Sequence, residues 1–174
     1  MKLKNGKELT IRKARAADAA ALINYVNTVI GESDNLLMCP GEFEMTLEQE
    51  ESFVEGMATS TTSAFMIGIV DGKIVSTGNI SASKRKRIAH MSGLGMSVLK
   101  EYWGQGVGTY LMQALIDFAR ASSTIEIIQL KVKEDNTRAI ALYQKMGFVD
   151  IAVVPKDLKI DGEYYGTVIM HLYL

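Results

Sequence analysis

The sequence predicts an α/β fold in which one mixed, mostly antiparallel sheet of about seven strands carries helices on both faces. Two Asp-Gly dipeptides, at positions 71–72 and 161–162, each separate two β-rich segments, which is the pattern of a β-hairpin. Elsewhere, segments of helical periodicity lie between strand-like segments, as in βαβ crossovers. Hairpins give antiparallel pairs and crossovers give parallel ones, so a chain with both needs a mixed sheet.

The composition predicts a single domain, residues 1–174, in the cytoplasm. Hydrophobic residues make up 48% of the 174 positions, which is enough for a substantial core. The 19 Lys and Arg residues nearly balance the 20 Asp and Glu residues, which argues against a nucleic-acid-binding protein.

The single cysteine, Cys39, excludes an internal disulfide and a cysteine-rich metal site. We therefore expect no bound metal. We also expect no membrane association, since no apolar run resembles a signal peptide or approaches the ~20 residues of a membrane span.

The first third of the chain predicts one short strand and two helices. Residues 9–13 have the apolar alternation of a strand. Residues 18–30 have helical apolar spacing and begin with an aspartate, which suits the positive end of a helix dipole. After a loop over residues 32–43, Thr46–Gln49 has the spacing of a capping box for a second helix that ends near Met57. Sparse apolar positions predict that this second helix lies on the surface.

The rest of the chain alternates strands with two helices. The strands are predicted at residues 64–70, 73–82, 88–98, 125–132, 148–154 and 164–172. One helix follows the glycine-rich stretch and ends near Ser122, and a shorter one lies between Asn136, its N-cap, and Gly147, its C-terminal stop. The basic run Lys84–Arg87 is expected to be a solvated hairpin tip, although it could also attract an acidic substrate or the phosphates of a cofactor.

The stretch VLKEYWGQGVGT, residues 98–109, has the features of an anion-binding loop. Glycines at positions 104, 106 and 108 allow backbone N–H groups to approach a ligand, and the following helix adds N–H donors at its positive end. No Lys follows the glycines, so the stretch is not a Walker A loop, and its G-x-G-x-G spacing does not match the dinucleotide fingerprint. A tight strand-to-helix turn without a ligand is the alternative.

Two blocks of sequence resemble the motifs of a known family. Residues 103–108, Trp-Gly-Gln-Gly-Val-Gly, align with an acyl-CoA signature that has Gln or Arg first, Gly fourth and Gly or Ala sixth. Residues 136–148, NTRAIALYQKMGF, match the pattern N-x-x-A-x-x-L-Y-x-x-x-G-F. With both blocks in this order, and with residues 94–98 similar to the family's fourth strand, nearly the whole chain resembles the GNAT superfamily of N-acyltransferases.

The resemblance implies a GNAT-like fold and an acetyl-CoA site. The pyrophosphate would lie on the amides of the glycine-rich loop, and the pantetheine arm would pair with the backbone of the fourth strand. The residues implied to bind the cofactor are Met96, Ser97, Val98, Trp103, Gly104, Gln105, Gly106, Val107, Gly108, Thr109, Asn136, Ala139 and Tyr143.

Tyr143 matches the family's general acid, which gives a proton to the departing thiolate. Its alternative is a core aromatic on an amphipathic helix. His90 could act as the general base through a water molecule, because an unperturbed histidine has a pKa near 6.5, or it could be an ordinary strand histidine. Glu32 and Glu42 lie in the loop where this family shapes its substrate site, and both could equally be solvated loop acids.

Three positions depart from the family pattern. Trp103 replaces the first Gln or Arg of the signature, so phosphate binding there depends on backbone amides. Gly93 lies where the related branch has Glu, and Gly166 lies where we expect an acid near the last strand. The substrate chemistry is therefore predicted less fully than the cofactor site.

The leading hypothesis is an acetyl-CoA-dependent N-acetyltransferase in which a primary amine attacks directly in a ternary complex. The acceptor is a small molecule or a peptide; polyamines, aminoglycosides, amino acids and protein N-termini all remain open, because acceptor loops vary. A CoA-binding regulatory domain without turnover is the alternative, and a partner-binding module with a purely structural glycine loop is a third hypothesis. The resemblance also makes a homodimer an expectation, since dimers are common in the family.

Overall fold

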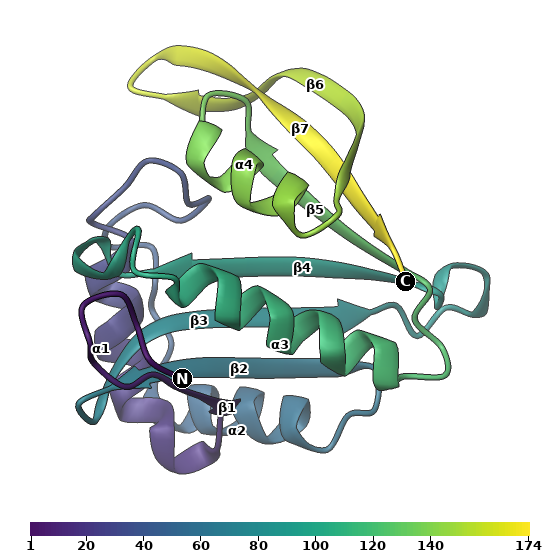
Figure 1. Cartoon of the computed structure of the whole chain (residues 1–174). Helices are drawn as coiled ribbons and strands as arrows, with labels where there is room; N and C mark the ends of the chain where they lie inside the picture. The colour runs from purple at the N-terminus through teal and green to yellow at the C-terminus, as the bar shows by residue number, and fades with distance from the viewer.

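The computed structural model describes residues 1–174 and contains one seven-stranded sheet with the order β1-β2-β3-β4-β5-β7-β6 (Figure 1). The strands are β1 (Thr10–Lys13), β2 (Ser63–Val70), β3 (Lys73–Ala82), β4 (Met91–Val98), β5 (Ile127–Lys133), β6 (Val149–Ile160) and β7 (Glu163–Tyr173). Every neighbouring pair is antiparallel except β4 and β5, which are parallel. This confirms the predicted mixed, mostly antiparallel sheet.

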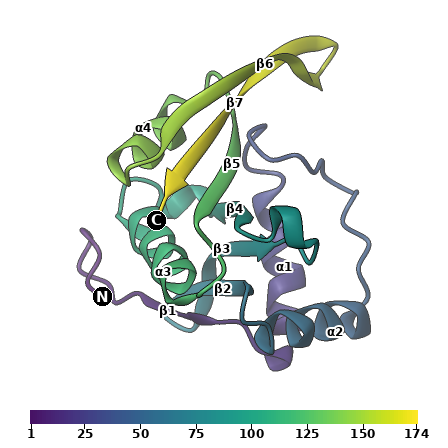
Figure 2. The same ribbon diagram turned by 90° about the vertical axis from the view of Figure 1, so that its right-hand side faces the viewer.

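Helices cover both faces of the sheet, as predicted. The α-helices are α1 (Ala19–Val29), α2 (Leu47–Ala58), α3 (Val107–Ala121) and α4 (Thr137–Lys145), and three short 3-10 turns accompany them. Figure 2 shows α1 and α2 on one face and α3 and α4 on the other. None of these helices has the length and apolar character needed to cross a membrane.

Local sequence signals account for several of the boundaries. The Thr46 hydroxyl accepts from the Gln49 backbone N–H at 3.2 Å and the Gln49 side chain accepts from the Thr46 N–H at 2.9 Å, so the predicted capping box begins α2. At the β2–β3 turn, Asp71 and Gly72 both have positive φ, which gives a two-residue turn of the primed type that suits a hairpin. Gly147, with φ of 94°, follows the end of α4.

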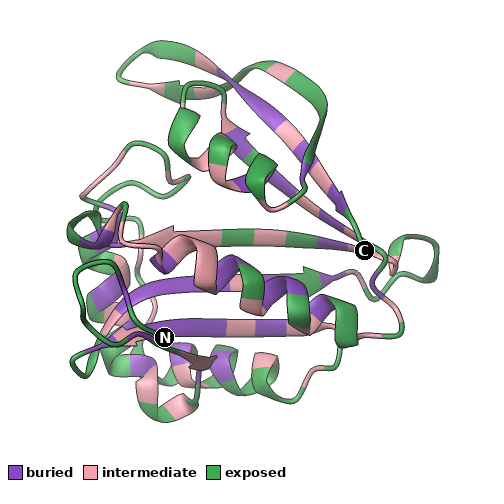
Figure 3. Cartoon of the chain, in the orientation of Figure 1, coloured by how far each residue is buried: buried purple, intermediate pink, exposed green.

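Three clusters of buried hydrophobic residues pack on the sheet, and the two larger ones contain residues of α3; Figure 3 shows the buried residues in purple. The main core contains α3, α4 and the strands that they cover, with Leu111 and Met170 fully buried. A second core lies nearer the N-terminus and includes Leu9, Tyr25 and Val107. Since α3 contributes to both cores, its first turn is held firmly in place, and that turn follows directly on the glycine-rich stretch.

The structure corrects three local predictions. β6 continues past residue 154 to Ile160; it is an edge strand, where Pro155 can lack an N–H donor without breaking a ladder. Asp18 ends a 3-10 turn before α1 instead of lying within the α-helix. His90 lies in a turn before β4, so its predicted position within a strand is wrong.

Residues 1–9 form an N-terminal hairpin that the sequence patterns do not predict. The Leu3 and Leu9 N–H groups donate hydrogen bonds of 2.9 and 2.7 Å to the opposite arm, and Gly6, with φ of 85°, lies in the turn. Both leucines pack into the second core, with 4% and 1% of their surface exposed. This packing orders a segment whose sequence is mostly polar.

The parallel pair β4–β5 is the feature that creates a site. The two strands are paired only over Met91–Gly93 and Ile127–Gln129. Beyond this point they diverge, and β4 keeps only β3 as a partner over Leu94–Val98 (Figure 1). The unpaired edge of β4 therefore leaves backbone donors and acceptors available in the middle of the molecule.

Candidate active site

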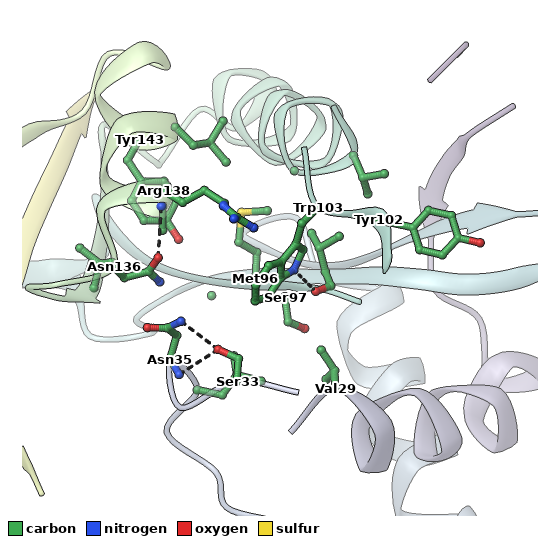
Figure 4. A pocket seen from close by; sticks show the side chains of 18 of the residues that line it. Val29, Ser33, Asn35, Met96, Ser97, Tyr102, Trp103, Asn136, Arg138 and Tyr143 are labelled. Carbon is green, nitrogen blue, oxygen red and sulfur yellow. Dashed lines mark hydrogen bonds between the residues drawn. The ribbon is translucent and has the colours of Figure 1, made fainter. Parts of the chain in front are cut away.

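A cleft of about 1380 Å³ lies where β4 and β5 diverge. It is lined by the loop after α1, the end of β4, the glycine-rich stretch, β5 and α4, and Figure 4 shows some of the side chains that line it. All thirteen residues predicted to bind the cofactor line this one cleft, although they come from two regions of the chain, residues 96–109 and 136–143. The structure thus brings the two motifs together.

The glycine-rich loop presents free backbone N–H groups to the cleft. Gly104 and Gly106 have φ of 75° and 101°, values that residues other than glycine rarely adopt. Gly106 is the N-cap of α3. The Tyr110 N–H is bonded to the Gly106 carbonyl at 3.1 Å, which closes the first turn. The N–H groups of residues 107–109 precede this bond and have no acceptor within the helix. They suit an anionic group at the helix N-terminus.

Trp103 makes a specific contact in place of the expected Gln or Arg. Its indole N–H donates to the Val98 carbonyl oxygen at 2.7 Å, which ties the loop to the end of β4. The Arg138 guanidinium from α4 stacks on the indole ring, 4.6 Å from the ring centre. A positive charge therefore lies beside position 103 even though Trp103 itself carries none.

The hydrogen bonds of β4 show which of its residues face the cleft. The Leu99 N–H bonds to the Val75 carbonyl on the β3 side, whereas the Val98 carbonyl bonds to Trp103 on the opposite side. Backbone groups alternate in direction along an antiparallel strand, so the peptide groups of Met96 also point away from β3. Met96 and Val98 can thus pair with an extended ligand lying along β4.

Tyr143 extends from α4 into the cleft and is buried on its other sides (Figure 4). Its ring packs against Phe148 with a centroid distance of 5.9 Å, so the packing interpretation of the residue holds. Burial raises the pKa of the Tyr143 hydroxyl to about 12. At neutral pH the hydroxyl therefore stays protonated and can act as a donor. On the same helix, the Asn136 side chain accepts from the Ala139 N–H at 3.3 Å, as an N-cap does.

A chain of three hydroxyl groups leads from the cleft into the second core. Ser97 lines the cleft; its hydroxyl lies 2.9 Å from the Tyr25 hydroxyl and 3.1 Å from the Thr77 hydroxyl. Burial raises the pKa of Tyr25 to about 12, so this chain holds protons and does not supply a base at neutral pH. Tyr25 lies 72 residues from Ser97, and no motif in the sequence indicates their contact.

The predicted acceptor and base residues are not all brought together. Glu32 lines the cleft, and its carboxylate accepts from the Lys100 backbone N–H at 2.6 Å. Glu42 does not line the cleft; its carboxylate accepts from the Cys39 N–H at 2.8 Å and closes a local turn. His90 also lies outside the cleft, before the paired start of β4. No cluster of three or more potential metal ligands is present.

Glycines occupy the two positions where we expected acids, and the surroundings of these two glycines differ. A side chain at Gly93 would meet nothing within 4 Å, so no other residue fills that space. At Gly166, the carboxylate of Glu134 takes the place of a side chain: it accepts from the Gly166 N–H at 2.6 Å. Glu134 does not line the cleft, so this acid supports the strand end and does not face a ligand.

Comparison with known proteins supports the resemblance to the GNAT superfamily that the two sequence motifs indicate. Residues 34–148 match the model of the acetyltransferase (GNAT) family. An N-alpha-acetyltransferase from Sulfurisphaera tokodaii is 30% identical over 170 residues, which cover 92% of this chain and 91% of that protein. An L-amino acid N-acetyltransferase from Escherichia coli is 29% identical over 99 residues, covering 57% of this chain and 61% of that protein.

Solved structures agree in fold. The crystal structure of a GNAT-family acetyltransferase from Streptococcus pneumoniae has a TM-score of 0.94 and 33% identity, and it covers 96% of this chain and 100% of that chain. An acetyltransferase structure from Salmonella typhimurium, determined with acetyl-CoA, has a TM-score of 0.83 at 19% identity, and covers 95% of this chain and 94% of that chain. With its fold, its cleft and both motifs in agreement, the chain belongs to the GNAT family of acetyltransferases.

Proposed function

We propose that the protein is an N-acetyltransferase that moves an acetyl group from acetyl-CoA to a primary amine by direct attack in a ternary complex. The observation that carries this proposal is the single cleft that joins an anion-binding loop, an unpaired strand edge and a buried tyrosine hydroxyl. Each of these suits one part of an acyl-CoA thioester: the loop suits the phosphates, the strand edge suits the amides of the pantetheine arm, and the tyrosine suits the sulfur.

The residues present fit acetyl-CoA. The free N–H groups of residues 107–109 and the positive φ of Gly106 form an anion site that carries no acidic side chain of its own. The Cβ of a larger residue at Gly108 would lie 3.2 Å from Leu142 and 3.5 Å from Met96, so glycine allows α3 to approach the cleft wall closely. When bound, acetyl-CoA supplies the activated acetyl group. The Salmonella typhimurium structure with acetyl-CoA supports the same choice of cofactor.

Tyr143 is proposed to donate its hydroxyl proton to the thiolate sulfur as the product forms. A buried hydroxyl with a pKa of about 12 keeps its proton at neutral pH, so it is available to hydrogen-bond to the sulfur and to protonate it as the C–S bond breaks. The peptide N–H groups of β4 that face the cleft would polarise the acetyl carbonyl. Both roles use groups that already point into the cleft.

The amine must lose a proton before it attacks, since free amines have pKa values near 10. Neither histidine of the chain lines the cleft, and the acids that do are Glu32, Asp34 and Asp135. Glu32 is proposed to contact the acceptor ammonium group, because it lines the cleft from the loop after α1, the segment in which the acceptor side was expected. Water at the open mouth of the cleft would take up the proton.

The acceptor is proposed to be an amine on an amino acid or a peptide, because the relatives are named for L-amino acids and for N-alpha-acetylation. A regulatory CoA-binding domain is the second candidate. The open cleft of about 1380 Å³ favours the enzyme, since a sensor without turnover needs no room for an acceptor. A cytoplasmic location and a homodimer stay predictions.

The deciding experiment measures thiol release from acetyl-CoA in the presence of a panel of amines that includes amino acids, peptides, polyamines and aminoglycosides. An enzyme releases CoA at a rate that depends on the identity and the concentration of one class of amine. Saturable acetyl-CoA binding without amine-dependent thiol release would instead establish the regulatory domain. Failure to bind acetyl-CoA would contradict both candidates and leave a structural glycine loop.

A further inference from the structure

The N-terminal hairpin, residues 1–9, brings two lysines to the rim of the cleft beside the glycine-rich loop. Lys2 and Lys4 both line the cleft. The Lys4 backbone N–H donates to the Gln105 carbonyl oxygen at 3.4 Å, so the hairpin contacts the loop directly. Figure 1 shows the hairpin beside the start of α3. A segment about 100 positions away from the loop in sequence is therefore part of the same site.

The two lysine side chains are exposed and free of ion pairs. Leu3, between them, is buried in the second core, and side chains alternate between the two faces of an extended arm. Lys2 and Lys4 therefore leave the arm on the opposite face from Leu3, and neither has a carboxylate partner within 4.0 Å. Lys7 on the other arm differs, since its ammonium group pairs with Asp71 at 2.8 Å and does not line the cleft.

The free lysines suit an anionic group additional to the one at the helix N-terminus. The N–H groups of residues 107–109 can accommodate a pyrophosphate without help from side chains. CoA carries a further phosphate on its ribose, and a phosphate monoester has a charge of about −1.5 to −2 at pH 7. Flexible ammonium groups at a solvent-exposed rim can follow such a group and neutralise it as point charges.

We propose that Lys2 and Lys4 bind the ribose 3′-phosphate of CoA, so that the N-terminal hairpin makes the protein distinguish CoA from 3′-dephospho-CoA. This inference rests on the proposed function, because it requires CoA to occupy the cleft. It assigns a cofactor-binding role to a segment that neither of the two sequence motifs includes.

The test is a calorimetric titration of the parent, the double variant Lys2→Gln/Lys4→Gln and the matched control Lys7→Gln with CoA and with 3′-dephospho-CoA. Glutamine keeps the apolar stem and removes the charge. We expect the parent to bind CoA about tenfold more tightly than 3′-dephospho-CoA. The double variant should bind both nucleotides alike, because only its affinity for CoA falls, and Lys7→Gln should keep the preference of the parent. Added salt should reduce the preference, since exposed charges are screened.

Three results would overturn the inference. Equal affinity of the parent for both nucleotides would show that the 3′-phosphate is not bound, while the proposed function would stand. An equal loss of affinity for both nucleotides in the double variant would show that the hairpin only supports the loop. Failure of the parent to bind either nucleotide would remove the proposed cofactor, and this inference with it.

Discussion

Tyr143 is the residue at which packing and chemistry can be separated by experiment. Tyr143→Phe keeps the ring against Phe148 and removes only the hydroxyl. We expect kcat to fall by about 100-fold, the order of effect that a proton donor contributes, while the dissociation constant of acetyl-CoA changes little. Steady-state kinetics together with calorimetric binding measure the two quantities. An unchanged kcat would leave Tyr143 as a core aromatic.

Gly106 is the residue that tests the anion site. Gly106→Asp adds a negative charge beside the free N–H groups of α3 at a φ of 101°, whereas Gly106→Asn imposes nearly the same shape and backbone strain without the charge. We expect the Asp variant to bind acetyl-CoA at least about tenfold more weakly than the Asn variant. Calorimetry on both variants, with thermal unfolding as the folding control, makes the comparison. Equal affinities would mean that no anion lies at this loop.

His90 is a residue for which sequence and structure differ. Six residues separate it from Met96, which at about 3.3 Å per strand residue is roughly 20 Å, and it does not line the cleft. We expect His90→Ala to leave the dependence of kcat/KM on pH between 5 and 9 unchanged. Measured pH–rate profiles of parent and variant would show this. A flattened profile in the variant would restore His90 as the base.

Single residues were predictable where a motif states the backbone requirement together with the side chain. The anion-binding character of the loop around Gly106 and the capping role of Asn136 follow from local chemistry, so both were predicted without coordinates. The contact of Ser97 with Tyr25 and that of Glu134 with Gly166 join residues 72 and 32 positions apart. Such contacts depend on strand order, which a motif does not contain.

At the level of elements, one ion pair fixes how β1 leads into α1. The Arg12 guanidinium donates two hydrogen bonds of 2.7 Å to the Asp18 carboxylate, which also accepts from the Arg15 N–H at 2.8 Å. The Arg12 hydrogen bonds are the main cause of a lowered pKa for Asp18. The sequence predicted that Asp18 interacts favourably with the dipole of the helix that follows. The structure shows that its carboxylate also pairs with Arg12.

Asp18→Asn should therefore lower the free energy of unfolding by about 1–2 kcal/mol at pH 7. A carboxylate whose pKa is lower in the folded state stabilises the protein above its unfolded pKa, and this contribution disappears as the pH falls through the folded pKa. The difference between parent and variant should thus shrink below about pH 4. Urea unfolding at pH 7 and at pH 3 measures it, with the exposed Asp150→Asn as a control that should differ little from the parent. A constant difference at both pH values would mean that the charge of Asp18 contributes nothing.

Elements were predictable to the extent that their ends carry turn or capping chemistry. Thr46, Asp71 and Gly147 mark ends that the structure confirms. β6 extends past its predicted end because its polar second half resembles a turn, and only its pairing with β7 shows that it is a strand. The N-terminal hairpin was missed for a related reason, since it is ordered by the burial of Leu3 and Leu9 in a core that it does not itself form.

For the whole molecule, the fold class was predictable because hairpins and crossovers leave distinct patterns along the chain. The cleft could be placed only after the resemblance had joined two blocks separated by a strand and a helix. Its acceptor side could not be predicted, since that side depends on where the loop after α1 comes to lie across the sheet. Glu32 reaches the cleft and Glu42 does not, although both belong to that loop.

Two of the buried tyrosines, Tyr25 and Tyr143, give the whole molecule a distinctive response to alkaline pH. Tyr25 lies in the second core and Tyr143 in the main core, and burial raises the pKa of each to about 12, from about 10 in the unfolded chain. A group whose pKa is higher in the folded state contributes stability that is present in full below the unfolded pKa and is lost as the pH rises through the folded pKa. Each tyrosine should therefore contribute on the order of 1–3 kcal/mol to a loss of stability between pH 10 and 12.

Chemical denaturation of the parent, Tyr25→Phe and Tyr143→Phe at intervals from pH 9 to 12 measures this loss. Lysine ionisation affects all three proteins alike, so the difference between parent and variant isolates the tyrosine. We expect the unfolding free energy of each variant to fall less steeply with pH than that of the parent. The absorbance of tyrosinate should show one fewer group titrating near pH 12 in each variant. If the pH dependence of a variant matches that of the parent, the hydroxyl it lacks is open to water in the folded protein. For Tyr143 that result would also remove the reason to expect a protonated donor in the cleft.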